Sequence, residues 1–284
     1  MAMSDRSNAA KTARRNAPSA NRLDLSDPDA RINEMLGQVS YCYRPSWDPA
    51  RSVIAAYLCV PMLPDGTSDA QRREAALIFG DDASAIEKLD VAVLRHAISV
   101  LEGLMRDKRK LLVTTPVHFE TLAVAVHRQR YIEVLRTKLA SDAASLLVIE
   151  LVNVPDGVPQ ARLLEITSPL RAHARAVIAR LRPETAEFGQ FAGSRISAVG
   201  CDLSRHTGSE TTMMQQMARF GRGAAKAGMA TYLRGVRSLS LTTAALGAGF
   251  AHIDGDAIAA NVDQPRGIVE FSLFDLYDST TPKG

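Results

Sequence analysis

The sequence predicts an α/β protein that folds as a closed, TIM-like (β/α)8 barrel, with a leading β-hairpin and a disordered N-terminal arm. Apolar strands alternate with helical segments from residue 86 onward, and the connections between them are short. This alternation indicates parallel strands covered by helices on their outer face. About seven such strands plus the hairpin, in a chain of 284 residues, suit a closed barrel better than an open sheet.

The N-terminal segment, residues 1–34, is predicted to be a flexible basic arm. It is rich in Ser, Asn, Ala, Arg and Asp and has almost no apolar periodicity, so it cannot bury enough surface to offset its ordering entropy. The arm could contact acidic partners or lipid headgroups, but an inert tail is the favoured interpretation because chain termini are disordered by default. Residues 35–278 form the predicted barrel domain.

The leading hairpin is indicated by two segments, 38–46 and 52–62, which are rich in Val, Ile, Tyr and Cys. A turn containing Asp48 and Pro49 joins them. The following segment, 63–82, contains Pro-Asp-Gly and Gly-Asp-Asp sequences, which are typical of a surface excursion. A short helix is expected within it at 70–78.

The remaining elements follow the alternation of helix and strand. Apolar residues near helical spacing predict the first long helix, and compact apolar runs predict the strands. The predicted helices are 86–106, 118–139, 162–175, 183–192, 210–227 and 236–246. The predicted strands are 110–117, 145–154, 176–181, 195–202, 229–233 and 250–253.

Composition narrows the class of protein. The formal net charge of +3 is small and lies largely in the arm, so we expect no nucleic-acid partner. The three cysteines are far apart and form no CxxC pair, which argues against a disulfide framework or zinc site and favours a cytoplasmic setting. No apolar run approaches the length of about 18 residues that spans a bilayer.

Candidate site residues lie where the predicted strands end, because the functional end of such a barrel is the carboxyl end of its strands. Glu150 lies within an otherwise apolar strand, and a carboxylate buried there needs a metal, an arginine or a proton. Asp202 is the last residue of a further predicted strand, and Asp254 directly follows another. Basic residues stand at the neighbouring strand ends: Arg180, Arg182 and Arg234.

At these strand ends the sequence resembles the EAL domain, the bacterial cyclic di-GMP phosphodiesterase fold. Tyr43-Arg44-Pro45 followed by Trp47-Asp48 is similar to the family's opening YQPIxD strand. The segment LLVIELV at 146–152 resembles LxLEITE, and AVGCD at 198–202 resembles the strand that ends in KID. LRGVR at 233–237 and HIDGDAI at 252–258 stand where the family has AEGVE and its late LGCDxxQGY turn. The resemblance spans about 38–277 and implies an EAL-type barrel.

The resemblance implies that active members hold two divalent cations with acids, an Asn, a Lys and a Gln, following two-metal logic. In this chain Glu150 and Asp202 match the family pattern. The first family Glu falls at Ala56, and a phosphate-contacting Arg falls at Val60. The Asn falls at Thr115 or its neighbour Thr114.

Further along the chain, the family's Asp pair falls at Arg180 and Leu181, and its Lys at Gly200. Its later Glu falls at Arg234 and its Gln at Asp254. Hard cations need several oxygen ligands, and a nearby arginine opposes a divalent ion by several kcal/mol. The resemblance therefore implies a degenerate domain that has lost Mg²⁺ and Mn²⁺ as cofactors and is a pseudoenzyme.

Arginine–carboxylate pairing is the expected replacement for the metals. In the favoured version the charges neutralise one another; in the alternative, surplus arginines among Arg180, Arg182 and Arg234 bind an anion such as a nucleotide phosphate.

The favoured function is a catalytically inactive signalling or scaffold protein with an unidentified protein partner. A receptor that binds cyclic di-GMP weakly without cleaving it ranks second, because Val60 and Arg44 replace the Arg and Gln of the usual binding pose. An active phosphodiesterase or an unrelated barrel enzyme ranks last, since folds host many functions but no nucleophile–base pair stands out. A homodimer is left open, because the segment 183–192 departs from the family pattern at its usual dimer contact.

Overall fold

The computed structural model describes residues 28–64, 72–79 and 82–278. Most of the predicted arm, 1–27, lies outside the described residues. The prediction is wrong for 28–34, because these residues belong to helix α1 (Pro28–Gly37). Ile32 is buried in the core, and Asp29 Oδ1 accepts a hydrogen bond of 2.7 Å from Lys88 Nζ. Tertiary contacts therefore fix a helix that the composition of the arm does not suggest.

The predicted hairpin is confirmed: β1 (Ser40–Asp48) and β2 (Val53–Pro64) pair antiparallel. Trp47 is fully buried at the end of β1, and its indole Nε1 donates to the carbonyl oxygen of Phe271 at 2.7 Å. This bond holds the C-terminal part of the chain against the hairpin.

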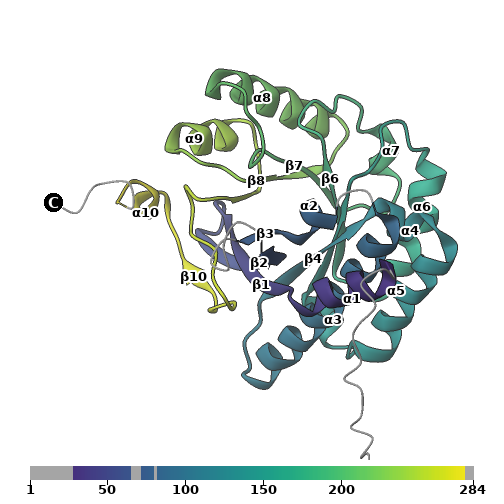
Figure 1. The fold of residues 1–284 in the computed structure, drawn as a ribbon. Helices are drawn as coiled ribbons and strands as arrows, with labels where there is room; N and C mark the ends of the chain where they lie inside the picture. Colours follow the sequence, from purple (N-terminus) through teal and green to yellow (C-terminus); the bar gives the residue numbers. More distant parts are fainter. Residues whose placement is uncertain (1–27, 65–71, 80–81, 279–284) are drawn as a thin grey trace, which may run out of the picture.

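The barrel predicted from the alternation is confirmed. Beyond the hairpin, parallel strands follow one another around the barrel, and β1 closes it by pairing antiparallel with both β2 and the last of these parallel strands, β9. Figure 1 looks along the barrel, with the strands in the centre and the helices around them. The remaining barrel strands are β4 (Leu112–His118), β5 (Leu147–Val152), β6 (Ala176–Leu181), β7 (Ala198–Asp202), β8 (Ala230–Arg234) and β9 (His252–Asp254).

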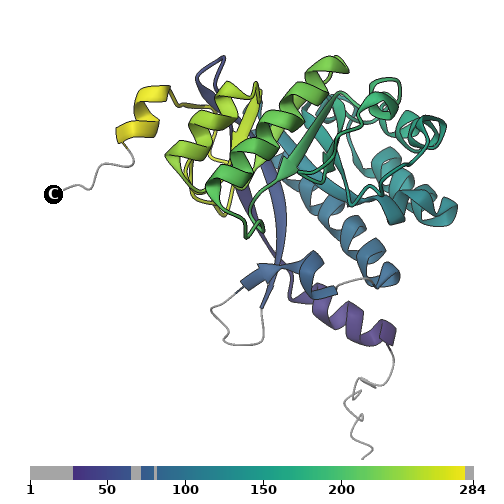
Figure 2. The same ribbon diagram turned by 90° about the horizontal axis from the view of Figure 1, so that it is seen from above.

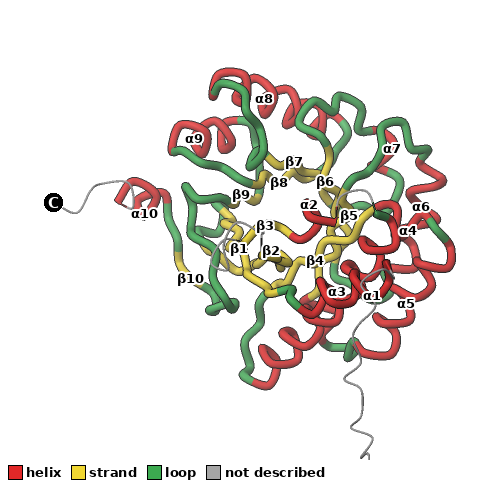
Figure 3. Tube along the Cα trace, viewed as in Figure 1, coloured by secondary structure: helices red, strands yellow, loops and turns green. Residues whose placement is uncertain are grey.

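Helices cover the outside of the strands, as Figure 3 shows in red and yellow. The apolar residues of these helices and of the outward strand faces form the main core. Met213 and Met217 are buried in this core, and Met214 packs against it. The covering helices are α3 (Ala83–Arg106), α4 (Phe119–Ala123), α5 (Ala125–Lys138), α6 (Gln160–Leu170), α7 (Gly189–Ala192), α8 (Glu210–Lys226) and α9 (Leu239–Gly247), with a 3-10 turn at η1 (Ala143–Leu146).

Several element boundaries differ from the prediction. The segment predicted as a helix at 70–78 contains a strand, β3 (Arg72–Glu74), and a short helix, α2 (Ala75–Phe79). The helix predicted at 118–139 is interrupted at Val124, whose backbone is extended. The helix predicted at 183–192 is reduced to α7, because residues 183–188 form a loop.

Two elements at the C-terminus are absent from the prediction. Strand β10 (Val269–Glu270) pairs antiparallel with Val53 and Ile54 of β2. Helix α10 (Leu273–Asp278) follows it and projects from the side of the barrel in Figures 1 and 2. Both elements are short and carry little periodic signal. Among the described residues, no helix combines the length and apolar character needed to cross a membrane.

Two glycines on the helix layer give opposite predictions for alanine. A Cβ at Gly221 of α8 would lie 2.2 Å from the carbonyl oxygen of Ala248, which is backbone and cannot move aside cheaply. A Cβ at Gly103 of α3 would meet only the Arg106 guanidinium, at 3.9 Å. We expect Gly221→Ala to destabilise the fold by about 1–3 kcal/mol. Gly103→Ala should stabilise it by about 0.5–1 kcal/mol. Urea unfolding followed by circular dichroism measures both, and equal shifts would contradict the α8–α9 packing.

Candidate functional site

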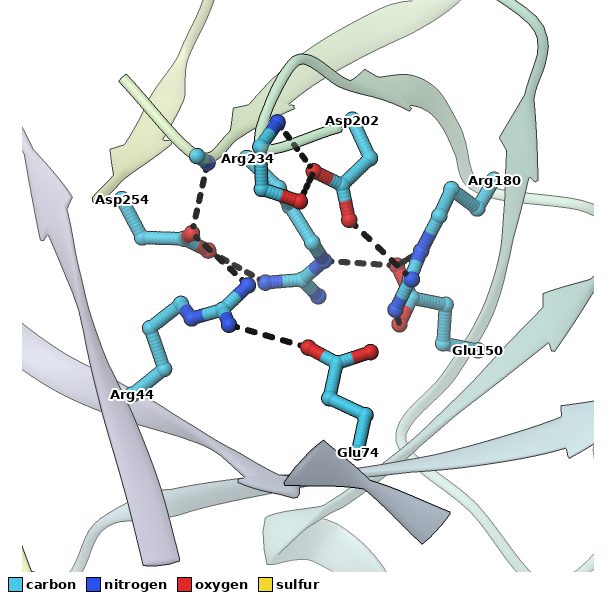
Figure 4. Close-up of polar contacts among 9 residues, drawn as sticks. Arg44, Glu74, Glu150, Arg180, Asp202, Arg234 and Asp254 are labelled. Atoms are coloured by element: carbon cyan, nitrogen blue, oxygen red, sulfur yellow. Dashed lines mark hydrogen bonds and ion pairs between the residues drawn. The ribbon is translucent and has the colours of Figure 1, made fainter. Parts of the chain in front are cut away.

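Seven charged side chains converge at the carboxyl end of the barrel strands, as Figure 4 shows. We call this group the arginine–carboxylate cluster. The strand register brings its members together; Asp202 of β7, for example, pairs with Arg234 of β8. The cluster consists of Arg44 on β1, Glu74 on β3, Glu150 on β5, Arg180 on β6, Asp202 on β7, Arg234 on β8 and Asp254 on β9.

Glu150 is the centre of the cluster and is fully buried. Arg180 donates from Nη2 to Oε2 at 2.6 Å and from Nε to Oε1 at 3.2 Å. Arg234 donates from Nε to Oε1 at 2.7 Å. Both carboxylate oxygens are therefore bonded to guanidinium groups, which is the arrangement that compensates a buried charge best.

Each of these arginines bridges to a second acid. Arg180 Nη1 donates to Asp202 Oδ2 at 3.2 Å, and Arg234 Nη1 donates to Asp254 Oδ2. The other oxygen of Asp202 accepts from the backbone N and Oγ of Ser204, at 2.9 and 2.6 Å. All the oxygens of Glu150 and Asp202 therefore have donors within the fold.

Arg44 closes the cluster on the hairpin side. Its Nη2 donates to Glu74 Oε1 at 3.2 Å, and its Nη1 lies 4.0 Å from Asp254 Oδ1. The same oxygen of Asp254 accepts from the backbone N of Gly235 at 3.3 Å. Three guanidiniums thus face four carboxylates, which gives the cluster a formal charge of −1.

The protonation states follow from burial and pairing. Burial by itself would raise the pKa of Glu150, but the charges and hydrogen bonds of Arg180 and Arg234 outweigh it and hold that pKa well below its usual range. Burial by itself would lower the pKa of both arginines, but Glu150 and the neighbouring acids together outweigh it and raise each pKa above its usual value. The pKa of Asp202 is lowered as well, since Arg180 and Ser204 outweigh burial.

The structure brings together five of the residues singled out in the sequence: Glu150, Asp202, Asp254, Arg180 and Arg234. It places Arg182 elsewhere, because β6 ends at Leu181 and the chain turns outward. There Arg182 Nη1 donates to Asp156 Oδ2 at 3.1 Å, and both side chains are 69% exposed. Sequence reasoning missed Glu74 and the pairing of Asp254.

Other family positions do not lie in the cluster. Ala56 lines a cavity at the opposite end of the barrel. Thr115 is fully buried on the helix side of β4, since its neighbour Thr114 lines the barrel interior and side chains alternate along a strand. Val60 is also buried, on the same face of β2 as the interior residue Leu58.

Gly200, where the family has a Lys, accommodates an aromatic ring. A Cβ at this position would lie 2.5 Å from Cδ2 of Tyr232. The Tyr232 ring therefore packs against bare backbone inside the barrel, and the Arg234 guanidinium carbon lies 4.9 Å from the ring centroid.

The donor set does not fit a pair of divalent cations. Such ions need several free oxygen ligands, but the oxygens of Glu150 and Asp202 are bonded to arginine, serine or backbone donors. Within the described part of the chain, no group of three or more His, Cys, Asp and Glu side chains is arranged to hold a metal ion.

Removing Arg234 should test the structural importance of the cluster. Arg234→Met leaves Asp254 and one oxygen of Glu150 without their close guanidinium partner, so we expect a loss of about 3–5 kcal/mol in the free energy of unfolding. Arg182→Met is the matched control, because it breaks only an exposed pair and should cost less than about 1 kcal/mol. Urea unfolding measures both. Equal stability of the two variants would mean that the buried bonds do not form.

The lowered pKa of Glu150 makes a pH-dependent prediction. Its contribution to stability is complete above its ordinary pKa, near 4.5, and is lost as pH falls further, because the unfolded chain then takes up the proton first. Glu150→Gln should therefore be less stable than the wild type at pH 7, with a difference that narrows below about pH 4.5. Asp202→Asn should show the same sign with a smaller difference. Denaturant unfolding across this pH range would contradict the prediction if the difference stayed constant.

Comparison of the fold with solved structures finds EAL-domain proteins. The Bacillus subtilis YkuI protein, with an EAL domain in complex with substrate c-di-GMP and calcium, aligns with a TM-score of 0.64 at 12% identity, over 84% of this chain and 58% of that one. An EAL domain protein from Listeria monocytogenes aligns with a TM-score of 0.62 at 12% identity, over 84% of this chain and 95% of that one.

The Xanthomonas citri FimX EAL domain, solved in complex with c-di-GMP, aligns with a TM-score of 0.61 at 13% identity, over 84% of this chain and 98% of that one. No protein-family model matches the sequence, and a search of curated proteins finds no match. The chain spans just over half the length of YkuI and nearly the whole of the other two proteins. The fold of this chain is that of the EAL domain.

Proposed function

We propose that this chain is a non-catalytic EAL-fold protein that acts through contacts with a protein partner. The observation that carries the proposal is the bonding of Glu150, whose two carboxylate oxygens both accept from guanidinium groups. This carboxylate stands where the family resemblance places a metal ligand. A buried acid committed to two arginines is not available for a cation.

A metal ion bound at Glu150 would have to displace the two arginines that contact it. Binding through Glu150 would separate it from Arg180 and Arg234, and breaking a buried ion pair costs about 3–5 kcal/mol. The freed guanidiniums would then repel a divalent cation placed among them. Two-metal hydrolysis, which relies on a pair of cations to polarise the phosphodiester and generate hydroxide, is therefore disfavoured.

Exposed apolar side chains support a partner-binding role. The C-terminal segment 268–277 presents Ile268 and Phe274, which are 61% and 82% exposed. Val269, Leu273 and Tyr277 are also exposed in this segment. Five exposed apolar side chains within one ten-residue segment favour an interaction site there. The three cysteines are unpaired, which favours a reducing compartment such as the cytoplasm.

The alternative is a receptor that binds cyclic di-GMP without hydrolysing it. It is supported by the fold, since the EAL domains of YkuI and FimX were solved in complex with c-di-GMP. Two features disfavour it. The cluster has a formal charge of −1, so it offers no surplus of positive charge to a phosphate. Arg44 is already bonded to Glu74.

Titration calorimetry with cyclic di-GMP, with and without Mn²⁺ or Mg²⁺, tests the proposal when combined with an assay for linear product. We expect neither binding nor product, because the carboxylates and arginines satisfy one another. Binding at micromolar strength without product would favour the receptor instead. Product that depends on added metal would overturn both functions.

A further inference from the structure

A cavity of about 350 Å³ opens at the N-terminal end of the barrel, opposite the arginine–carboxylate cluster. We call it the lower cavity. Residues at or next to the first positions of the parallel strands line it, together with the hairpin. Six alanines form much of its wall: Ala55, Ala56, Ala176, Ala198, Ala230 and Ala251.

The alanines explain why the cavity exists. Barrels of this class are normally packed with bulky branched side chains that leave no pore. In this chain β6, β7 and β8 each begin with an alanine that lines the interior: Ala176, Ala198 and Ala230. The missing volume is not filled from elsewhere, so the lower cavity remains open to solvent.

Large buried side chains contribute to the inner wall. Tyr232 and Arg234 both line the lower cavity and are both buried. The Tyr232 ring is held against Gly200, and Arg234 is bonded to Glu150 and Asp254. These contacts fix the deep part of the cavity independently of any ligand. Such a preformed, mainly apolar concavity is typical of small-molecule sites.

The mouth of the cavity carries one uncompensated charge. Arg51 is paired with Asp48, its Nη1 donating to Oδ2 at 2.6 Å. Burial lowers the pKa of His252, and the further influences of Asp48, Arg51 and Arg234 leave it below its usual value, so its ring is neutral at pH 7. Arg175 lines the mouth, and among the described residues no carboxylate lies within ion-pair distance of it.

Arg175 is also well placed on the backbone. It directly precedes β6, and its backbone N donates to the carbonyl oxygen of Leu147 at 2.9 Å, which anchors it to the neighbouring strand. Its guanidinium is free to meet an anionic group, and hydrogen bonds from guanidinium to carboxylate are among the strongest in proteins. Ser46 and Ser197 line the same cavity.

We propose that the lower cavity binds a small amphipathic carboxylic acid, with its apolar body between the alanines and its carboxylate at Arg175. The volume is near the lower end of the range for small-molecule pockets, about 300–1,000 Å³, which restricts the ligand to a short chain or a single ring system. An amine is disfavoured because Asp48, the acid at the mouth, is engaged by Arg51. This binding site is independent of the function proposed for the opposite end.

Three eight-carbon probes with different head groups test the proposal on the full chain: octanoate, octanol and octylamine. Titration calorimetry at pH 7 should give octanoate the tightest binding, with octylamine the weakest. Arg175→Met should weaken octanoate by about tenfold, to the level of octanol, because only the charge-assisted bond is lost. Arg182→Met, which removes an exposed arginine at the other end of the barrel, should change nothing.

Filling the cavity provides the second arm. Ala198→Leu should abolish binding of all three probes while the protein keeps its circular dichroism spectrum. Ala225→Leu, an exposed site on α8, is the matched control and should bind normally. If Ala198→Leu does not fold, Ala176→Leu fills the same wall from β6. Unchanged octanoate binding in the filled variant, or no binding of octanoate to the wild type at about 5 mM, would overturn the proposal.

Discussion

The bonding of Glu150 by two arginines is the interaction on which the interior of this barrel depends. A carboxylate with no exposed surface cannot stay charged without close counter-charges. Arg180 and Arg234 supply them, but each is then a charge that needs a further acid, which Asp202 and Asp254 provide. Those acids in turn draw in Ser204, Gly235 and Arg44, and Arg44 reaches Glu74 near the surface. Each buried charge is therefore compensated by the next member of the cluster outward, and the last member, Glu74, is partly exposed to solvent.

The cluster also fixes how the strands pair. The bond between Arg234 and Glu150 joins residues 84 positions apart, across strands that are not neighbours in the barrel. A register shift of one residue in β5 or β8 would turn these charges toward the apolar helix layer, away from the opposite charges of the cluster. A buried ion pair is not in general more stable than a well-packed apolar group of the same size. Its effect here is to make alternative registers costly.

The sequence predicts the barrel well because period and length distinguish its strands from its helices. It also identifies Glu150 as requiring a partner, since an acid within VIELV cannot be there for packing. Strand ends then bring Asp202, Arg180 and Arg234 to the same place through topology alone. The sequence could not show whether Arg182 lies inside or outside the cluster, because the alternation of side chains stops where β6 ends at Leu181. Glu74 lies in a segment with turn signals on its N-terminal side, and only pairing with β2 makes it a strand residue.

The same strands give the two ends of the barrel opposite properties. The inward-facing residues of β6 run from Ala176 through Ile178 to Arg180, and those of β8 from Ala230 through Tyr232 to Arg234. The small residue at the start of each strand leaves space at the amino end of the barrel. The charged residue at the end of each strand occupies the carboxyl end. In barrels of this class the carboxyl ends of the strands normally supply the open site. Here the charged side chains at that end are bonded to one another, whereas the cavity between the alanines lies at the amino ends. Because the cluster is held by bonds among its own members, a change at the alanine end can alter binding without disturbing the charges above it.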